Sequence, residues 1–227
     1  MKIRFIFSII AISFSLKAWS YDGQPSSASD MTDRHSYWGA AGAYYFLPLG
    51  SLNSQISTYG FSKGFTNATA VGIDHGGEAT SDKFKLPFVS YLSFHYLLPQ
   101  EITSTLNSSD KMKLNGYNFQ FDFLAWNYLK SEQFSFTAGL AWAFGRLKVT
   151  ENSPAGTTTF LDKYFAPQLR TEFNIMLGNH FYMGIRASYR VDVTKTGWTR
   201  SGIASAPDLP GTRLSGGMVG AFIGFGK

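Results

Sequence analysis

The feature that most constrains the fold is an alternation of bulky apolar residues with small or polar residues, sustained over runs of twelve to sixteen residues. From Tyr117 to Phe123 an aromatic residue occupies every second position, and Asn118, Gln120 and Asp122 lie between them. Successive side chains of a β-strand point to opposite faces, so this pattern predicts strands with one bulky and one polar face. Strands of soluble proteins usually have about 5–6 residues, whereas a tilted strand needs about 9–11 to cross the hydrocarbon of a membrane. The long alternation therefore favours membrane-spanning strands.

Seven segments show the alternation clearly enough to be predicted as strands. They cover residues 38–47, 84–98, 115–129, 134–149, 162–177, 180–193 and 213–226. The connections between them differ in length. Two turns are short, at 130–133 and 178–179, whereas long connections are expected at about 62–83, 99–114, 151–161 and 194–212. Short turns on one side and long loops on the other are typical of outer-membrane β-barrels.

The number of strands follows from the way such a barrel closes. If both chain ends lie on the side of the short turns, the number of strands is even. One more strand must then lie between residues 50 and 80. The segment Leu52–Phe61 fits best, because polar residues alternate there with Ile56 and Thr58, and Phe65–Asp74 is the other candidate. We therefore predict eight strands, with ten as the alternative.

The chemistry of the two faces distinguishes a membrane barrel from a soluble one. Aromatic residues make up 17% of the chain and charged residues only 15%, compared with about 25% charged residues in a typical soluble domain. An eight-stranded barrel has room inside only for ordinary side-chain filling, which runs of Phe and Trp would exceed. In a membrane barrel the same aromatic face contacts lipid. The sequence thus predicts an all-β fold, a closed antiparallel up-and-down transmembrane β-barrel over residues 37–227, with a secreted lipocalin-like or sandwich fold as the alternative.

The first twenty residues are typical of a secretory signal peptide. A basic start precedes an apolar run from Phe5 to Leu16, and small residues stand at Ala18 and Ser20. The run is too short for a transmembrane helix, which needs about twenty residues, and no later stretch is long and apolar enough. We expect cleavage after Ser20, followed by a flexible polar leader at 21–36. Cleavage would leave 17 basic and 15 acidic residues, so the net charge would fall from +5 to +2 and give no argument for a nucleic-acid partner.

Charged residues lie on the face opposite the aromatic residues in several predicted strands. They are Asp122, Arg170, Glu172, Arg186, Arg190 and Asp192. In a membrane barrel this face lines the lumen, where buried charges must pair. Because side chains fill the interior of an eight-stranded barrel, we expect a salt-bridge network that largely closes the lumen. A gate or an ion path is the alternative interpretation.

Candidate catalytic and cofactor-binding residues are few. The four histidines show no metal-ligand spacing, and the chain contains no cysteine and no phosphate-binding loop. Ser93 and His95 share one strand face and are the candidate nucleophile and base of a lipid-modifying acyl hydrolase or transferase. Two such residues on one face are common by chance, and no G-x-S-x-G motif is present. We therefore predict no cofactor, no metal site and no enzymatic activity.

The connection at 194–212 contains the candidate surface residues. Lys195, Trp198 and Arg200 combine positive charge with an aromatic ring. Near the rim of a membrane barrel, such residues can contact lipopolysaccharide phosphates or the surface of a partner. An ordinary mobile loop is the alternative.

With these strands and turns, the chain resembles the small outer-membrane β-barrels of Gram-negative bacteria, the class of the OmpA membrane domain and OmpX. The resemblance extends over about residues 37–226 and concerns architecture, not a motif. Members usually end on an aromatic residue that the barrel-assembly machinery reads, whereas Phe225 is third from the end here. The resemblance implies location in the outer membrane, insertion by that machinery, and contact with membrane lipid and lipopolysaccharide.

The function expected from these observations is non-enzymatic. The protein would have a structural or surface-interaction role through long extracellular loops, with a surface partner that the sequence does not name. A narrow pore for small solutes and a lipid-modifying acyl enzyme are the two alternatives.

Overall fold

The computed structural model describes residues 31–81, 87–130, 133–177, 180–194, 197–202, 209–211 and 213–226. The predicted signal peptide and most of the predicted leader lie outside the described residues, as does Lys195. The elements in chain order are β1 (Met31–Tyr45), α2 (Gly50–Ser57), β2 (Ala68–Ser81), β3 (Pro87–Thr103), β4 (Lys111–Lys130), β5 (Phe134–Ser153), β6 (Gly156–Leu177), β7 (Phe181–Arg190), β8 (Thr199–Gly202) and β9 (Gly216–Gly226).

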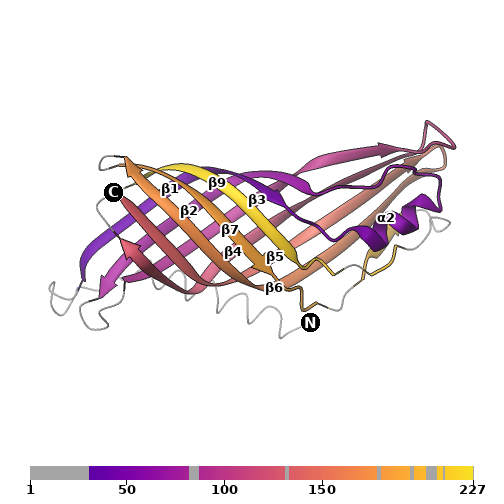
Figure 1. Ribbon diagram of the computed structural model, residues 1–227. Helices are drawn as coiled ribbons and strands as arrows, with labels where there is room; N and C mark the ends of the chain where they lie inside the picture. The colour runs from indigo at the N-terminus through magenta and orange to yellow at the C-terminus, as the bar shows by residue number, and fades with distance from the viewer. Residues whose placement is uncertain are drawn as a thin grey trace.

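Eight of these strands form a closed antiparallel barrel (Figure 1). Consecutive strands pair with one another from β1 to β7, and β9 pairs with both β7 and β1, which closes the ring. The short strand β8 pairs only with the distal part of β6, outside the ring. The predicted up-and-down barrel of eight strands is therefore confirmed. No helix in the described residues is long and apolar enough to cross a membrane.

The first strand of the barrel starts earlier in the chain than the sequence predicts. The strand β1 starts at Met31 and is paired with β2 from its first residue, so it includes the last part of the segment assigned to the leader. The start of β1 and the end of β9 lie at the same end of the barrel, because Tyr37 pairs with Gly226. We call this end the turn end and the opposite end, which carries α2, the loop end.

The prediction of a strand at Leu52–Phe61 is wrong, because this segment contains α2 (Gly50–Ser57). Leu52 and Ile56 are four positions apart, lie on one face of the helix and are fully buried. The spacing of four matches a helix and not the period of two that a strand requires. The eighth strand is β2, which overlaps the other candidate, Phe65–Asp74, but starts later and continues to Ser81.

The expected long connections also differ from the structure. The region 62–83 contains the whole of β2, and the long connection before β2 is 46–67. The strand β3 ends at Thr103 and β4 begins at Lys111, so the connection between them is only 104–110. The region 151–161 is part of a long hairpin, because β5 and β6 have 20 and 22 residues and are separated by only two. The region 194–212 contains β8.

The outer face of the barrel carries a broad apolar band. All eight barrel strands contribute large hydrophobic side chains to it, and Leu169 and Ile185 are each 63% exposed. Such exposure of apolar side chains around an entire closed sheet is expected where the surrounding solvent is lipid. We therefore treat the band as the membrane-spanning part of the barrel.

The polarity of the wall reverses toward the loop end of β4, β5 and β6. Cross-strand pairing places Phe119, Phe144 and Phe165 in one outward row. The next row toward the loop end contains Tyr117, Arg146 and Lys163. Beyond this row most inward side chains are apolar and buried, as they are in a protein surrounded by water, and Asp162 is an exception. The reversal marks the edge of the lipid.

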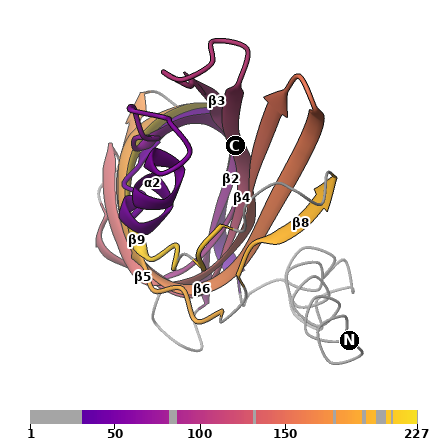
Figure 2. The same ribbon diagram turned by 90° about the vertical axis from the view of Figure 1, so that its right-hand side faces the viewer.

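A compact apolar cluster, which we call the mouth core, fills the barrel at the loop end. Its wall residues include Met112, Leu114, Leu147, Val149 and Phe160, and its residues from the connections include Leu49, Leu52, Ile56, Phe61, Phe65, Leu209 and Leu214. Figure 2, which views the molecule from this end, shows α2 within the ring of strands. Complete burial of a side chain such as Leu52 or Ile56 contributes about 1.5–3 kcal/mol. The mouth core therefore holds α2 firmly in the opening.

Candidate functional site

The lumen is the candidate site, and its first layer at the turn end is a stack of aromatic rings. The ring of Tyr37 lies 5.2 Å from that of Tyr182 and 5.3 Å from that of Phe222, measured between centroids. All three side chains are buried. The Tyr37 hydroxyl donates a hydrogen bond of 2.9 Å to Glu172, which connects this stack to the next layer.

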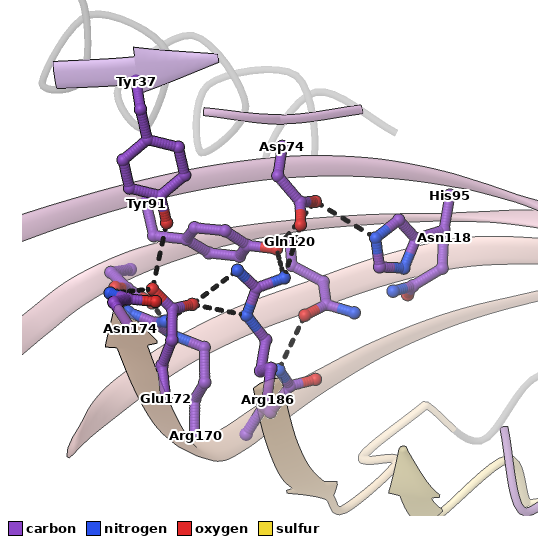
Figure 3. Close-up of polar contacts among 12 residues, drawn as sticks. Tyr37, Asp74, Tyr91, His95, Asn118, Gln120, Arg170, Glu172, Asn174 and Arg186 are labelled. Atoms are coloured by element: carbon purple, nitrogen blue, oxygen red, sulfur yellow. Dashed lines mark hydrogen bonds and ion pairs between the residues drawn. The ribbon is translucent and has the colours of Figure 1, made fainter. Parts of the chain in front are cut away.

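The second layer, which we call the charged cluster, consists of Asp74, Asp122, Arg170, Glu172 and Arg186. Figure 3 shows Asp74, Arg170, Glu172 and Arg186 of this cluster. Glu172 lies at its centre, and one carboxylate oxygen accepts hydrogen bonds of 2.7 Å from Arg170 and 2.6 Å from Arg186. The outer carboxylates complete the chain of charges. Asp122 accepts two hydrogen bonds from Arg170, and Asp74 accepts one of 2.7 Å from Arg186. The five side chains therefore alternate in sign across the lumen.

Neutral side chains satisfy other atoms of the charged cluster. The other oxygen of Glu172 accepts hydrogen bonds from Tyr37 and Asn174, each 2.9 Å long. The Tyr91 hydroxyl donates to Asp74 at 2.9 Å, and the Tyr91 ring faces both guanidinium groups at 3.9 and 4.4 Å. Buried charges are tolerated when they are paired and additionally hydrogen-bonded, which is the arrangement here.

The structure brings together four of the six predicted lumen charges, namely Asp122, Arg170, Glu172 and Arg186. Arg190 and Asp192 are also buried but lie nearer the loop end. Arg190 donates to the Leu214 carbonyl and to the Tyr164 hydroxyl, and Asp192 accepts from the backbone N–H groups of Thr194 and Leu214. Among the described residues, no ion pair joins these two to the charged cluster. Their contacts hold the connection between β7 and β9 against the wall instead.

His95 occupies a layer between the charged cluster and the mouth core. Its Nδ1 lies 2.6 Å from the Tyr45 hydroxyl, and its Nε2 lies 3.1 Å from Asp74. The Tyr45 oxygen already accepts hydrogen bonds from Asn118 and Gln120, so its own proton is directed at His95. A ring that accepts at Nδ1 and donates from Nε2 satisfies all of these contacts.

This geometry argues against a role for Ser93 and His95 as nucleophile and base. Both ring nitrogens of His95 are engaged, one by Tyr45 and one by Asp74, and neither contacts the Ser93 hydroxyl. Both residues are 1% exposed inside the lumen, away from the lipid that an acyl enzyme would modify. A nucleophile requires a base within hydrogen-bond reach and access to the substrate. Among the described residues there is also no group of three or more metal-ligating side chains suited to hold a metal ion.

Asp162 is a buried acid in β6 at the loop end, beyond the apolar band. It is 1% exposed, and its Oδ2 has no hydrogen-bond partner among the described residues. Burial and the Asp192 carboxylate raise the pKa of Asp162 to about 7, against the effect of a hydrogen bond from the Lys163 backbone. The folded protein therefore binds a proton here more tightly than the unfolded chain does.

Asp162→Asn should make the protein more stable at pH 8 while changing little at pH 4. In the native protein, stability falls as the pH rises from about 4 to 7, because folding must then either keep a proton on Asp162 or bury its charge. We expect a gain of about 2 kcal/mol at pH 8, below the full value of the pKa shift because water reaches the loop end. Urea titrations of the protein in lipid vesicles at both pH values measure it. The control Glu101→Gln removes an exposed carboxylate at the same end, and an equal gain in both variants would contradict the assignment.

The three surface candidates have different environments. Lys195 lies outside the described residues. Trp198 is half-buried and packs against the mouth core, so its ring contributes to the closure of the barrel. Arg200 is exposed in β8, which pairs with β6 through Phe160 and its neighbours.

Sequence reasoning missed several residues of the lumen. Asp74 was missed because β2 consists mainly of small residues and lacks the bulky alternation. Tyr37 and Tyr45 were missed as ligands of the charged residues because aromatic residues were expected to face lipid. Tyr91 shares a face with Ser93 and His95 in the sequence pattern but was not connected with the lumen charges. The hydroxyl groups of the three tyrosines could have indicated a position in the lumen. A tyrosine beside lumen arginines can contact a cation with its ring and donate a hydrogen bond from its hydroxyl.

Comparisons with known proteins give no match in sequence and several matches in structure. No protein-family model and no curated protein matches the chain. Among solved structures, Ail, the attachment invasion locus protein of Yersinia pestis, is similar in two crystal structures. One is a complex with the heparin analogue sucrose octasulfate, with 11% identity, a TM-score of 0.46 and coverage of 86% of this chain and 100% of that chain. The other has 12% identity, a TM-score of 0.44 and coverage of 85% and 97%.

A third similar structure is that of Neisserial surface protein A, NspA. It has 9% identity and a TM-score of 0.40, and the match covers 86% of this chain and 97% of that chain. At these identities, the likeness to Ail and NspA is one of fold.

Proposed function

We propose that this protein is a non-enzymatic outer-membrane barrel with a closed lumen, which acts through the surface that it presents outside the cell. The observation that carries the proposal is the filling of the lumen by buried side chains from one end to the other. The aromatic stack, the charged cluster, the His95 layer and the mouth core follow one another along the axis. A barrel filled in this way has only its outer surface and its loop end available for interaction.

The apolar band supports the membrane location. On β1 from Ser36 onward and on the other described barrel strands, outward positions carry no charged residue up to the row of Phe119, Phe144 and Phe165. A charged side chain facing lipid at the midplane costs about 2–4 kcal/mol, so its absence is expected there. In this proposal the signal peptide is removed after Ser20, the barrel-assembly machinery inserts the chain, and the loop end faces outward.

The strands β4, β5 and β6 support the surface role. They continue well beyond the apolar band, and β8 widens the sheet that they form at the loop end. Their inner face is covered by the mouth core, and their outer face is left to solvent. This wall, together with α2 and the neighbouring connections, forms the surface available to a partner.

The folded protein should show no stable current in planar lipid bilayers, because no continuous water path crosses the filled lumen. Folding of the same preparation is checked by heat-modifiable migration on a gel, and recovery of urea-resistant protein in the outer-membrane fraction checks the location. Reproducible single-channel steps would favour the small-solute pore instead. Release of the protein as a soluble periplasmic product would contradict the membrane barrel.

A further inference from the structure

Two stretches of chain are tied together where β7 ends and β9 is about to begin. We call this place the β7–β9 junction, and it consists of Arg190, Asp192, Thr194, Leu214 and Ser215. One Asp192 oxygen accepts hydrogen bonds from the backbone N–H, at 2.9 Å, and the hydroxyl of Thr194, and the other accepts one of 2.9 Å from the Leu214 N–H. The Asp192 N–H donates to the Ser215 hydroxyl, and Arg190 donates to the Leu214 carbonyl, both at 2.9 Å. The Asp192 carboxylate thus joins segments that are 22 positions apart.

The β7–β9 junction lies against β6 directly beside Asp162. The Val193 N–H donates to the Phe165 carbonyl at 3.2 Å, and the Thr194 hydroxyl donates to the Lys163 carbonyl at 3.5 Å. Asp162 precedes Lys163 in β6, and its side chain is buried on the inner face of that strand. A change of charge on Asp162 therefore acts on the junction.

Asp162 has no buried cation beside it on the neighbouring strands. Its cross-strand partner on β5 is Leu147, with Gly145 and Val149 at the adjacent inward positions. The cation of β8, Arg200, is exposed and lies in register with Phe160. The Oδ2 atom of Asp162 is buried without a hydrogen-bond partner among the described residues. Such surroundings favour the protonated form of an acid.

The charged groups of the β7–β9 junction act in the same direction. Burial, together with the Asp192 carboxylate, raises the pKa of Asp162 to about 7. The one cation of the junction, Arg190, donates to the Leu214 carbonyl and to the Tyr164 hydroxyl. Asp162 and Asp192 therefore repel each other when both are charged, and Asp192 is the acceptor on which the junction depends.

We propose that protonation of Asp162 controls a local opening of the β7–β9 junction, so that acid tightens the junction and neutral pH loosens it. When the proton leaves, release of Thr194 and Leu214 lets the two carboxylates separate and reach water, and the Leu214 side chain leaves the mouth core. The opened junction returns the pKa of Asp162 to its ordinary value. Opening is thus favoured as the pH rises from about 4 to 7 and changes no further above 7. This motion does not depend on which way the loop end faces.

The test is amide hydrogen exchange, which reports local opening, on the folded full-length protein in lipid nanodiscs at pH 5 and pH 8. The reporters are the N–H groups of Thr194 and Leu214. The reference is the Thr105 N–H, which donates to the Gly60 carbonyl at 2.8 Å in another part of the loop end. Each rate is divided by the intrinsic rate of an unprotected amide at the same pH. Relative to Thr105, exchange at both reporters should become faster by about tenfold or more between pH 5 and pH 8.

Three variants connect this change to the carboxylates. Asp162→Asn cannot lose a proton and should exchange at pH 8 as the wild type does at pH 5. Asp192→Asn removes the second charge and weakens the acceptor, so it should speed exchange at both pH values and reduce the difference between them. The matched control Glu101→Gln removes an exposed carboxylate at the same end and should retain the full wild-type change.

Three results would overturn the proposal. The first is exchange at Thr194 and Leu214 that does not differ between pH 5 and pH 8. The second is an equal change at Thr105, which would mean that the whole loop end loosens. The third is a full change in Asp162→Asn. The comparison of reporters and reference within the wild type decides the matter even if a variant fails to fold.

Discussion

Replacing Glu172 by glutamine should lower the free energy of unfolding by about 3–5 kcal/mol, because it leaves two buried arginines with an incomplete set of counter-charges. Glu172 lies between Arg170 and Arg186 and is 3% exposed. Urea titration in lipid vesicles measures the change. The matched control is Glu101→Gln, which removes the acid of an exposed pair with Lys111 and should cost no more than about 1 kcal/mol.

A double replacement separates the loss of pairing from the loss of packing. Asp122→Leu alone leaves Arg170 with only one carboxylate, whereas Asp122→Leu/Arg170→Met removes both charges and keeps most of the volume. Because an apolar replacement of a complete buried pair is often neutral, the double variant should be more stable than Asp122→Leu alone. If the losses of stability from Asp122→Leu and from Arg170→Met simply add in the double variant, the ion pair is not what couples these residues.

Replacing both buried residues of α2, in Leu52→Asp/Ile56→Asp, should expel the connection 46–67 from the barrel mouth. Each carboxylate would have to be buried in the mouth core without a partner, and loss of either apolar side chain alone costs about 2–5 kcal/mol. Limited proteolysis should then cut within 46–67 while the barrel keeps its heat-modifiable migration. The control Ser51→Asp/Ser54→Asp adds the same charges to exposed positions of the same helix.

The expelled variant should still carry no current, since the charged cluster continues to fill the lumen nearer the turn end. Combining it with Glu172→Ala and Arg186→Ala should produce measurable conductance, because both closures are then weakened. A current from the α2 variant alone would mean that the mouth core is the only closure. Resistance of 46–67 to protease in the α2 variant would mean that Leu52 and Ile56 do not hold the helix in place.

The fold could be predicted because alternation in β4 to β7 is imposed by lipid on one side and by polar residues on the other. The same period of two assigned Arg170, Glu172 and Arg186 to a common face. Asp74 could not be found in this way, because Gly72 and Gly76 flank it in a strand of small residues without an aromatic face. The bulge between Asp122 and Leu124 also shifts the faces within β4, which no periodic pattern predicts.

The loop end could not be predicted from the same rule, because its surroundings change from lipid to water. Arg146 and Lys148 continue the outward face of Phe144, and Leu147 and Val149 continue the inward face of Ala143. Each β-strand therefore continues beyond the apolar band, but its outward face becomes polar there and its inward face becomes apolar. Prediction ended β5 at 149 and started β6 at 162 because it required apolar residues on the outside throughout.

This exchange of faces affects how the protein inserts into the membrane and how it stays inserted. In the proposed orientation, the distal hairpin of β5 and β6 crosses the bilayer before the mouth core can assemble around it. Withdrawal would require breaking that core and returning Arg146, Lys148 and Lys163 to hydrocarbon, at about 2–4 kcal/mol for each cation at the midplane. The mouth core and the cations around it thus oppose withdrawal of the hairpin, which makes membrane insertion effectively irreversible.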